Sequence, residues 1–179
     1  MVRRVAFALL CTLLALPAVA ALKAGDKAPA FTAQASLGGK VFTYSLAAAL
    51  RNGPVVLYFY PAAFTEGCTI EAHDFAEATE KYKVLGATVI GVSHDDIETL
   101  NRFSVSECRG KFAVAADTDQ RIMKAYDAVL APLLSYANRV SYVIAPEGRI
   151  VYSYTNMNPD QHVENTLSAL KEWRSRQKP

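Results

Sequence analysis

Cysteine is scarce in this sequence. The 179 residues include three, Cys11, Cys68 and Cys108, and none of them belongs to a Cys-x-x-Cys or Cys-x-x-x-Cys pair. This scarcity excludes a disulfide-dense scaffold. His73 and His94 have no partners at zinc or copper spacing, so we expect solvated or hydrogen-bonded histidines, no metal and no cofactor.

The sequence also lacks an excess of charge of either sign. Lys and Arg total 19 and Asp and Glu total 17, a formal net charge of +2. Residues 1–20 hold two arginines and no acid, so the remainder carries 19 − 2 = 17 basic and 17 acidic residues. A balanced chain of this kind gives no reason to expect nucleic acid, an anionic membrane or a strongly charged substrate as a partner.

Long apolar runs are absent, apart from one at the N-terminus. Met-Val-Arg-Arg leads into VAFALLCTLLAL, and Pro17 and Ala18-Val19-Ala20 follow. This run is shorter than the roughly 20 residues that span a bilayer, but the pattern is typical of a cleavable export signal. We therefore expect cleavage near Ala20 and a mature chain of residues 21–179. That chain would be exported, to the periplasm or outside the cell, without stable membrane insertion.

The remaining residues contain no repeats or low-complexity segments and predict one α/β domain. Continuous apolar runs indicate buried strands, and turn residues and helix caps mark the other boundaries. The expected elements are strands at 31–34, 41–44, 54–60, 87–93, 112–116, 140–145 and 149–154, and helices at 46–50, 66–83, from Asp95 as cap towards Cys108, 119–126, and from Asn158-Pro159 to Arg174. This order predicts a mixed central β-sheet flanked by helices, with an N-terminal β-hairpin. The apolar segment 128–138 lacks a clean period and is either a packed loop or a contact surface.

The segment PAAFTEGC, residues 61–68, connects a buried strand to a helix. Thr65 is in the position of an N-cap, which makes Cys68 the third residue of the first helical turn. The thiol then lies among unpaired backbone N–H groups at the positive end of the helix dipole. Helical spacing places Cys68 on the same stripe as Ala72 and Phe75, so the sulfur faces the protein body. Such a shielded, electropositive setting favours the thiolate.

These residues resemble a known family. The pattern Pro-x-x-x-Thr-x-x-Cys at 61–68, directly after YFY, is similar to the active-site signature of peroxiredoxins. The continuation Cys-Thr-x-Glu-Ala at 68–72 most resembles the bacterioferritin-comigratory, or Q-type, subgroup. The likeness extends through 91–95 and 115–119 to the strand 139–144, and so covers nearly the whole mature chain.

The resemblance implies a thioredoxin-like fold and a thiol peroxidase that reduces hydrogen peroxide and small organic hydroperoxides through Cys68. Arg139, the Thr65 hydroxyl and the Cys68 backbone N–H would stabilise the departing oxygen. Pro61 would shield the thiolate from water, and Glu71 would pair with Arg139 to orient its guanidinium.

The resemblance also implies a second cysteine that traps the oxidised Cys68 as a disulfide. Many Q-type proteins carry it five residues after the first, where this sequence has His73. Cys108, near the end of the helix after residues 91–95, is then the candidate, and Gly110 and the polar stretch 104–107 suggest that this end can loosen. A thioredoxin-like dithiol would recycle the disulfide, and we expect a monomer or weak dimer.

Two other functions fit parts of the pattern. A general disulfide oxidoreductase would keep the fold, but the missing Cys-x-x-Cys motif argues against it. A non-catalytic module could use Cys68 and Cys108 as a structural disulfide, the ordinary expectation for two cysteines in an exported protein.

Overall fold

The computed structural model describes residues 21–131 and 135–177. The predicted export signal, residues 1–20, and part of the apolar segment 128–138 lie outside the described residues. The elements along the chain are β1 (Thr32–Leu37), β2 (Lys40–Ser45), α1 (Leu46–Leu50), β3 (Val55–Phe59), α2 (Glu66–Val84), β4 (Thr88–Ser93), α3 (Ile97–Ser106), β5 (Ala113–Ala116), α4 (Arg121–Ala125), β6 (Val140–Ile144), β7 (Ile150–Thr155) and α5 (His162–Arg176).

The strands form one sheet in the order β2-β1-β5-β4-β3-β6-β7. β3, β4 and β5 run parallel, whereas β6 pairs antiparallel with β3, and β1 and β2 pair antiparallel with each other. The mixed central sheet with flanking helices confirms the fold class. All five residues of β3 are buried, as expected for an apolar strand covered on both faces.

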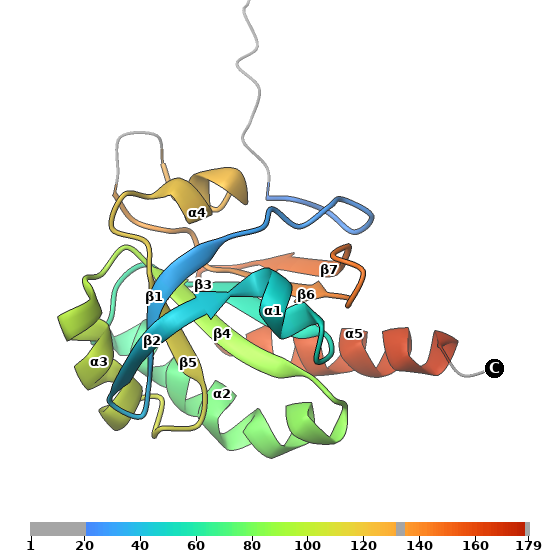
Figure 1. Cartoon of the computed structure of the whole chain (residues 1–179), viewed down its shortest axis with the longest axis horizontal. Coiled ribbons are helices and arrows are strands. Elements are labelled where there is room, and N and C mark those ends of the chain that lie inside the picture. The colour runs from blue at the N-terminus through green and yellow to red at the C-terminus, as the bar shows by residue number, and fades with distance from the viewer. Residues whose placement is uncertain (1–20, 132–134, 178–179) are drawn as a thin grey trace, which may run out of the picture.

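Helices cover both faces of the sheet (Figure 1). α2, α3 and α5 lie on one face, and α1 and α4 lie on the other. Cys68 and Cys108 both belong to the apolar cluster on the α2 side, together with Tyr58, Tyr60 and Phe75. The two sulfurs are therefore embedded in the same half of the core. Within the described ranges, no helix combines the length and apolarity needed to cross a membrane.

Two predicted helix starts are wrong. The cap of α3 is Asp96, whose side chain accepts a hydrogen bond from the Thr99 N–H at 2.7 Å, and not Asp95. Asn158 and Pro159 lie in turns before α5, because the Asn158 side chain accepts from the Asp160 N–H and stabilises a local turn instead. α5 begins at His162.

Candidate active site

Cys68 lies where the sheet, a tight loop and a helix meet. β3 ends at Phe59, and α2 begins at Glu66 with Thr65 in the N-cap position. Cys68 is only 2% exposed, and Ala72 and Phe75 on the same stripe of α2 are fully buried. This confirms that the sulfur faces the protein body from the first turn of the helix.

The Arg139 guanidinium contacts the sulfur. Its Nη2 donates to Cys68 Sγ at 3.5 Å, its Nη1 donates to Glu71 Oε2, and its Nε donates to the Met157 carbonyl at 3.0 Å. Three partners, two on α2 and one in the segment after β7, thus fix the plane of the guanidinium. Gly67 leaves room for it, because a Cβ there would come within 3.2 Å of Nη2. The predicted pairing of Glu71 with Arg139 is confirmed.

The charges of this group are strongly coupled. Burial works against the Arg139 cation, but the neighbouring Glu71 and Cys68 outweigh it and raise the pKa of the guanidinium. Burial raises the pKa of Glu71 to about 8, although Arg139 pulls in the opposite direction. Arg139 is therefore a permanent cation between two acids that compete for it.

His162 is a neighbour of Glu71 that sequence reasoning missed. It is fully buried at the start of α5, and its Nδ1 lies 3.7 Å from Glu71 Oε1. Burial lowers the pKa of the His162 ring to about 4, and the positive charge of Arg139 acts in the same direction. No motif signals this residue, because the contact depends on how the last helix packs against α2.

Thr65 and Pro61 lie in the loop that leads to Cys68. The Thr65 hydroxyl donates to the Ala62 carbonyl at 3.0 Å, so its side chain does not cap α2. Its predicted cap position is confirmed, but the predicted cap hydrogen bond is not. Pro61 is half-buried directly after β3. With its one proton donated to the Ala62 carbonyl, the Thr65 hydroxyl makes no hydrogen bond to Cys68 in this conformation.

Asp95 fastens this loop to the end of β4. Its Oδ2 accepts hydrogen bonds from the Ala63 N–H at 2.8 Å and from the Ser93 hydroxyl at 2.7 Å. The adjacent Phe64 is 47% exposed and has φ of 64°, a left-handed conformation that is strained for a bulky residue. Asp95, which the sequence suggested as a helix cap, instead holds the loop in shape.

Cys108 follows the C-terminal end of α3 and is fully buried. It is a free thiol, as is Cys68. Burial raises the pKa of the Cys108 thiol well above its usual range, and the charge of Glu107 adds to the effect. In this conformation Cys108 is therefore a poor nucleophile.

A histidine–carboxylate hydrogen bond and an ion pair tie the Cys108 segment to α2. His73 Nε2 lies 2.8 Å from Glu107 Oε2, and Arg109 Nη1 lies 3.1 Å from Glu77 Oε1. The paired residues stand immediately before and after Cys108. His73 and His94 were both expected to be solvated or hydrogen-bonded. His73 makes this pair, and the His94 ring packs against Tyr136 with centroids 5.9 Å apart.

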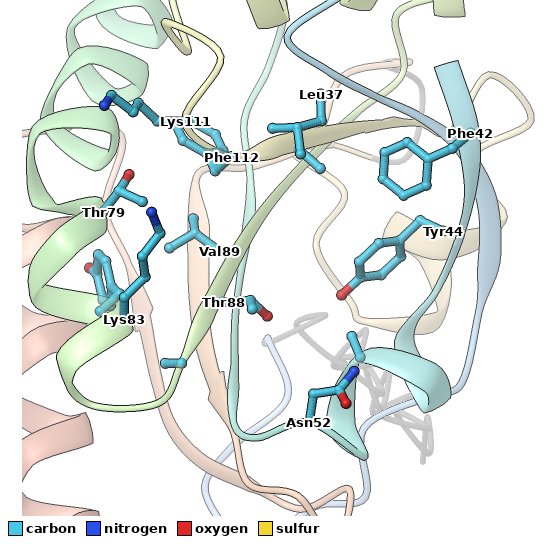
Figure 2. A pocket seen from close by; sticks show the side chains of 14 residues that line it. Leu37, Phe42, Tyr44, Asn52, Thr79, Lys83, Thr88, Val89, Lys111 and Phe112 are labelled. Atoms are coloured by element: carbon cyan, nitrogen blue, oxygen red, sulfur yellow. The ribbon is translucent and has the colours of Figure 1, made fainter. Parts of the chain in front are cut away.

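A pocket of about 280 Å³ lies elsewhere on the molecule (Figure 2). Its walls come from β1, β2, β4, the segment leading into β5, and the later turns of α2. The lining includes Leu37, Phe42, Tyr44, Asn52, Thr79, Lys83, Thr88, Val89, Lys111 and Phe112. None of its lining residues belongs to the Cys68 site, so the chemistry described above does not depend on this pocket.

Comparison with known proteins agrees with the geometry. A sequence profile described as the AhpC/TSA family matches residues 24–153, well over half of the chain. The chain belongs to the AhpC/TSA family.

The family relatives include Q-type and Bcp proteins. The chain is 35% identical over 122 residues to the chloroplastic peroxiredoxin Q of Triticum aestivum, covering 68% of this chain and 56% of that protein. It is 29% identical to peroxiredoxin Bcp of Escherichia coli, covering 84% of this chain and 97% of that protein. The crystal structure of peroxidoxin BcpB from Mycobacterium tuberculosis matches with a TM-score of 0.76 and 25% identity, covering 84% and 97% of the two chains. These matches confirm the thioredoxin-like fold.

Proposed function

We propose that this protein is a thiol-dependent peroxidase that reduces hydrogen peroxide and small organic hydroperoxides at Cys68. The observation that supports this most is the donation of Arg139 Nη2 to Cys68 Sγ while Nη1 is held by Glu71. A cation aimed at a buried sulfur favours the thiolate, which is the nucleophilic form of cysteine.

In the proposed reaction, the Cys68 thiolate attacks the outer oxygen of the hydroperoxide ROOH. The S–O bond forms, the O–O bond breaks, and the sulfur is oxidised to sulfenic acid while RO⁻ leaves and takes a proton from solvent. Arg139 would stabilise the charge as it moves from the sulfur to the leaving oxygen, together with the Cys68 N–H in the first turn of α2. Pro61 would shield the thiolate from water on the loop side, and the Thr65 hydroxyl would turn from the Ala62 carbonyl to donate to the leaving oxygen.

We further propose that Cys108 resolves the sulfenic acid. Its thiol condenses with the Cys68 sulfenic acid to form the Cys68–Cys108 disulfide and water. Cys108 is a buried free thiol, and in the proposed step its segment leaves the core before it meets Cys68. A thioredoxin-like dithiol would then reduce the disulfide with two electrons and restore both thiols. The N-terminal segment 1–20 supports an exported protein, so we place this cycle in the periplasm or outside the cell.

The test is a stopped-flow reaction of the reduced mature chain, residues 21–179, with hydrogen peroxide. We expect the wild type to react at least about 100-fold faster than free glutathione, because its donors are preorganised, and Cys68→Ser to abolish the reaction. Cys108→Ser is the matched control, which should keep the first oxidation but lose turnover with a dithiol donor. Peroxide consumption by Cys68→Ser at the wild-type rate would refute the assignment, and unchanged turnover by Cys108→Ser would refute the resolving role.

A further inference from the structure

Glu71 is fully buried, yet only one of its two carboxyl oxygens is hydrogen-bonded. Oε2 accepts from Arg139 Nη1, whereas Oε1 has no hydrogen-bond partner among the described residues. The distance of 3.7 Å from Oε1 to His162 Nδ1 exceeds that of a hydrogen bond. Burying an ionised carboxylate with one oxygen lacking a donor is unfavourable in free energy. Protonation of that oxygen removes the charge and with it most of this penalty.

His162 presents no proton to that oxygen. Its Nε2 lies 2.9 Å from the Asn156 carbonyl, which can only accept, so the ring proton is on Nε2. Nδ1 is then the acceptor of a neutral ring, and the Ser141 hydroxyl donates to it at 2.8 Å. The lowered pKa of the ring is consistent with this neutral state at physiological pH.

The other charged and titratable groups around the pair come from several elements. They are Cys68 and Asp74 on α2, Tyr58 on β3, Arg139 before β6, and Tyr154 on β7, whose ring packs against His162. Burial and Asp74 favour the neutral form of Glu71, and Arg139 favours the ionised form. Burial outweighs Arg139, in agreement with the unpaired Oε1.

We propose that His162 is a positioning residue of the peroxide site that acts through Glu71. Its neutral ring withholds a hydrogen-bond donor from Glu71 Oε1, so the carboxyl group keeps its proton while Cys68 is a thiolate. The proposal rests on Cys68 being the reacting group, and it adds a protonation state and a residue to that site.

In this arrangement the positive charge of Arg139 is balanced by the Cys68 thiolate and not by Glu71. A protonated Glu71 still accepts the Nη1 hydrogen bond through Oε2, so it orients the guanidinium without neutralising it. An ionised Glu71 would share the same cation with the thiolate and leave the buried group with an excess negative charge. Glu71 thus works as a neutral acceptor, and His162 keeps it neutral.

The first experiment compares Glu71→Gln with Glu71→Ala by stopped flow, as second-order rate constants with hydrogen peroxide from pH 6 to 9.5. Glutamine keeps a neutral acceptor, so we expect rates within about twofold of wild type at pH 7, whereas alanine should lose tenfold or more. Wild type should slow above about pH 8, as Glu71 ionises, and Glu71→Gln should not. Equal losses in both variants, or a flat wild-type profile, would overturn the proposal.

The second experiment tests two variants that should move the alkaline decline, the fall of the rate constant above about pH 8, in opposite directions. His162→Gln supplies an amide donor to Glu71 and should shift the decline to lower pH. Ser141→Ala frees Nδ1 to accept a hydrogen bond from the protonated Glu71 carboxyl and should shift the decline to higher pH. We expect shifts of roughly one pH unit each, and none in a Glu71→Gln background. Thr79→Val is the matched control, a buried change on α2 that removes a hydrogen bond to the Phe75 carbonyl and involves neither His162 nor Glu71.

The outcomes separate this proposal from the function on which it rests. If His162→Gln changed the rate profile equally in the wild-type and Glu71→Gln backgrounds, His162 would have a merely structural role. That result would overturn the proposal. Activity that depends on Cys68 but shows no such shifts leaves the peroxidase assignment intact. Activity that survives Cys68→Ser removes the peroxidase assignment and the role of His162 with it.

Discussion

At the scale of single residues, the site depends on how Arg139 divides its three donating nitrogens. One contacts the sulfur, one Glu71 and one the Met157 carbonyl. Only a planar guanidinium can serve three partners in one plane, because an ammonium group is a compact point charge. The identity of the residue therefore matters more than its charge.

Arg139→Lys should lose most of the peroxidase activity although the charge is kept. We expect a fall of about 100-fold in the second-order rate constant with hydrogen peroxide, because one ammonium cannot keep both the sulfur and Glu71 contacts. Stopped-flow kinetics of the reduced protein measure it. Arg121→Lys is the control, since Arg121 is exposed and pairs only with Asp119 in a surface contact. A wild-type rate in Arg139→Lys would contradict the assigned role.

The residues of the site differ in how far the sequence could predict them. Cys68 and Glu71 lie close together in one local pattern, whereas Arg139 was assigned through the family resemblance, and of their contacts the Glu71–Arg139 pair was predicted. His162 was missed, because a histidine at the start of a helix has no periodic or capping signature that links it to α2. Asp95 was misassigned because two adjacent acids both fit a helix cap, and local sequence could not decide which one turned back to the loop.

At the scale of elements, the contact between α2 and the end of α3 would restrain Cys108 in the proposed resolving step. Glu107 and Arg109 flank the cysteine and pair with His73 and Glu77 on α2. Ser104, which we expected in a loosely held polar stretch, is instead buried and hydrogen-bonded to Ser36 and to the Gly39 N–H. A segment that opened to release Cys108 would therefore be short and begin after Ser104.

Breaking these pairs should speed formation of the disulfide. In the double variant Glu77→Gln, Glu107→Gln, we expect the Cys68–Cys108 bond to form about two- to fivefold faster after one equivalent of peroxide, since partly exposed pairs contribute little each. Thiol counting by mass spectrometry after rapid acid quench follows the reaction.

The control for this experiment is Glu80→Gln, which removes the exposed pair with Lys83 on the same helix without touching α3. An unchanged rate of disulfide formation in the double variant would mean that opening leaves both pairs intact. A slower rate would mean that the pairs guide Cys108 towards Cys68 and do not restrain it.

At the scale of the whole molecule, the buried network couples stability to pH. The pKa of His162 is lowered from 6.5 to about 4 by burial, so the folded chain binds fewer protons than the unfolded chain between these values. Its contribution to stability is thus full above pH 6.5 and is lost as the pH falls towards 4. Glu71 acts in the opposite sense, because its raised pKa removes stability as the pH rises from about 4.5 to 8.

His162→Gln should therefore flatten the acid side of the stability curve. Relative to the variant, wild type should lose about 3 kcal/mol of unfolding free energy between pH 7 and pH 4, at 1.36 kcal/mol for each pKa unit. Urea unfolding followed by circular dichroism at several pH values measures the difference. Parallel curves for the two proteins would show that the folded His162 ring titrates like the unfolded one.

The fold of the whole chain was largely predictable, because β3, β4 and β6 are apolar runs that only a doubly covered sheet can bury. The site was predictable as far as it lies in the segment from β3 into α2 and at the start of β6. The packing of α5 could not be predicted, because the apolar pattern of a helix does not show which residues its first turn contacts.

The segment after β7 has a consequence for truncation. The matched family region ends at residue 153, but Met157 and His162 complete the surroundings of the guanidinium and of Glu71. A fragment cut after residue 153 keeps Cys68, Glu71 and Arg139, but the guanidinium loses its backbone acceptor and Glu71 loses its histidine neighbour. Such a minimal fragment therefore carries the motif without the groups that hold it in place.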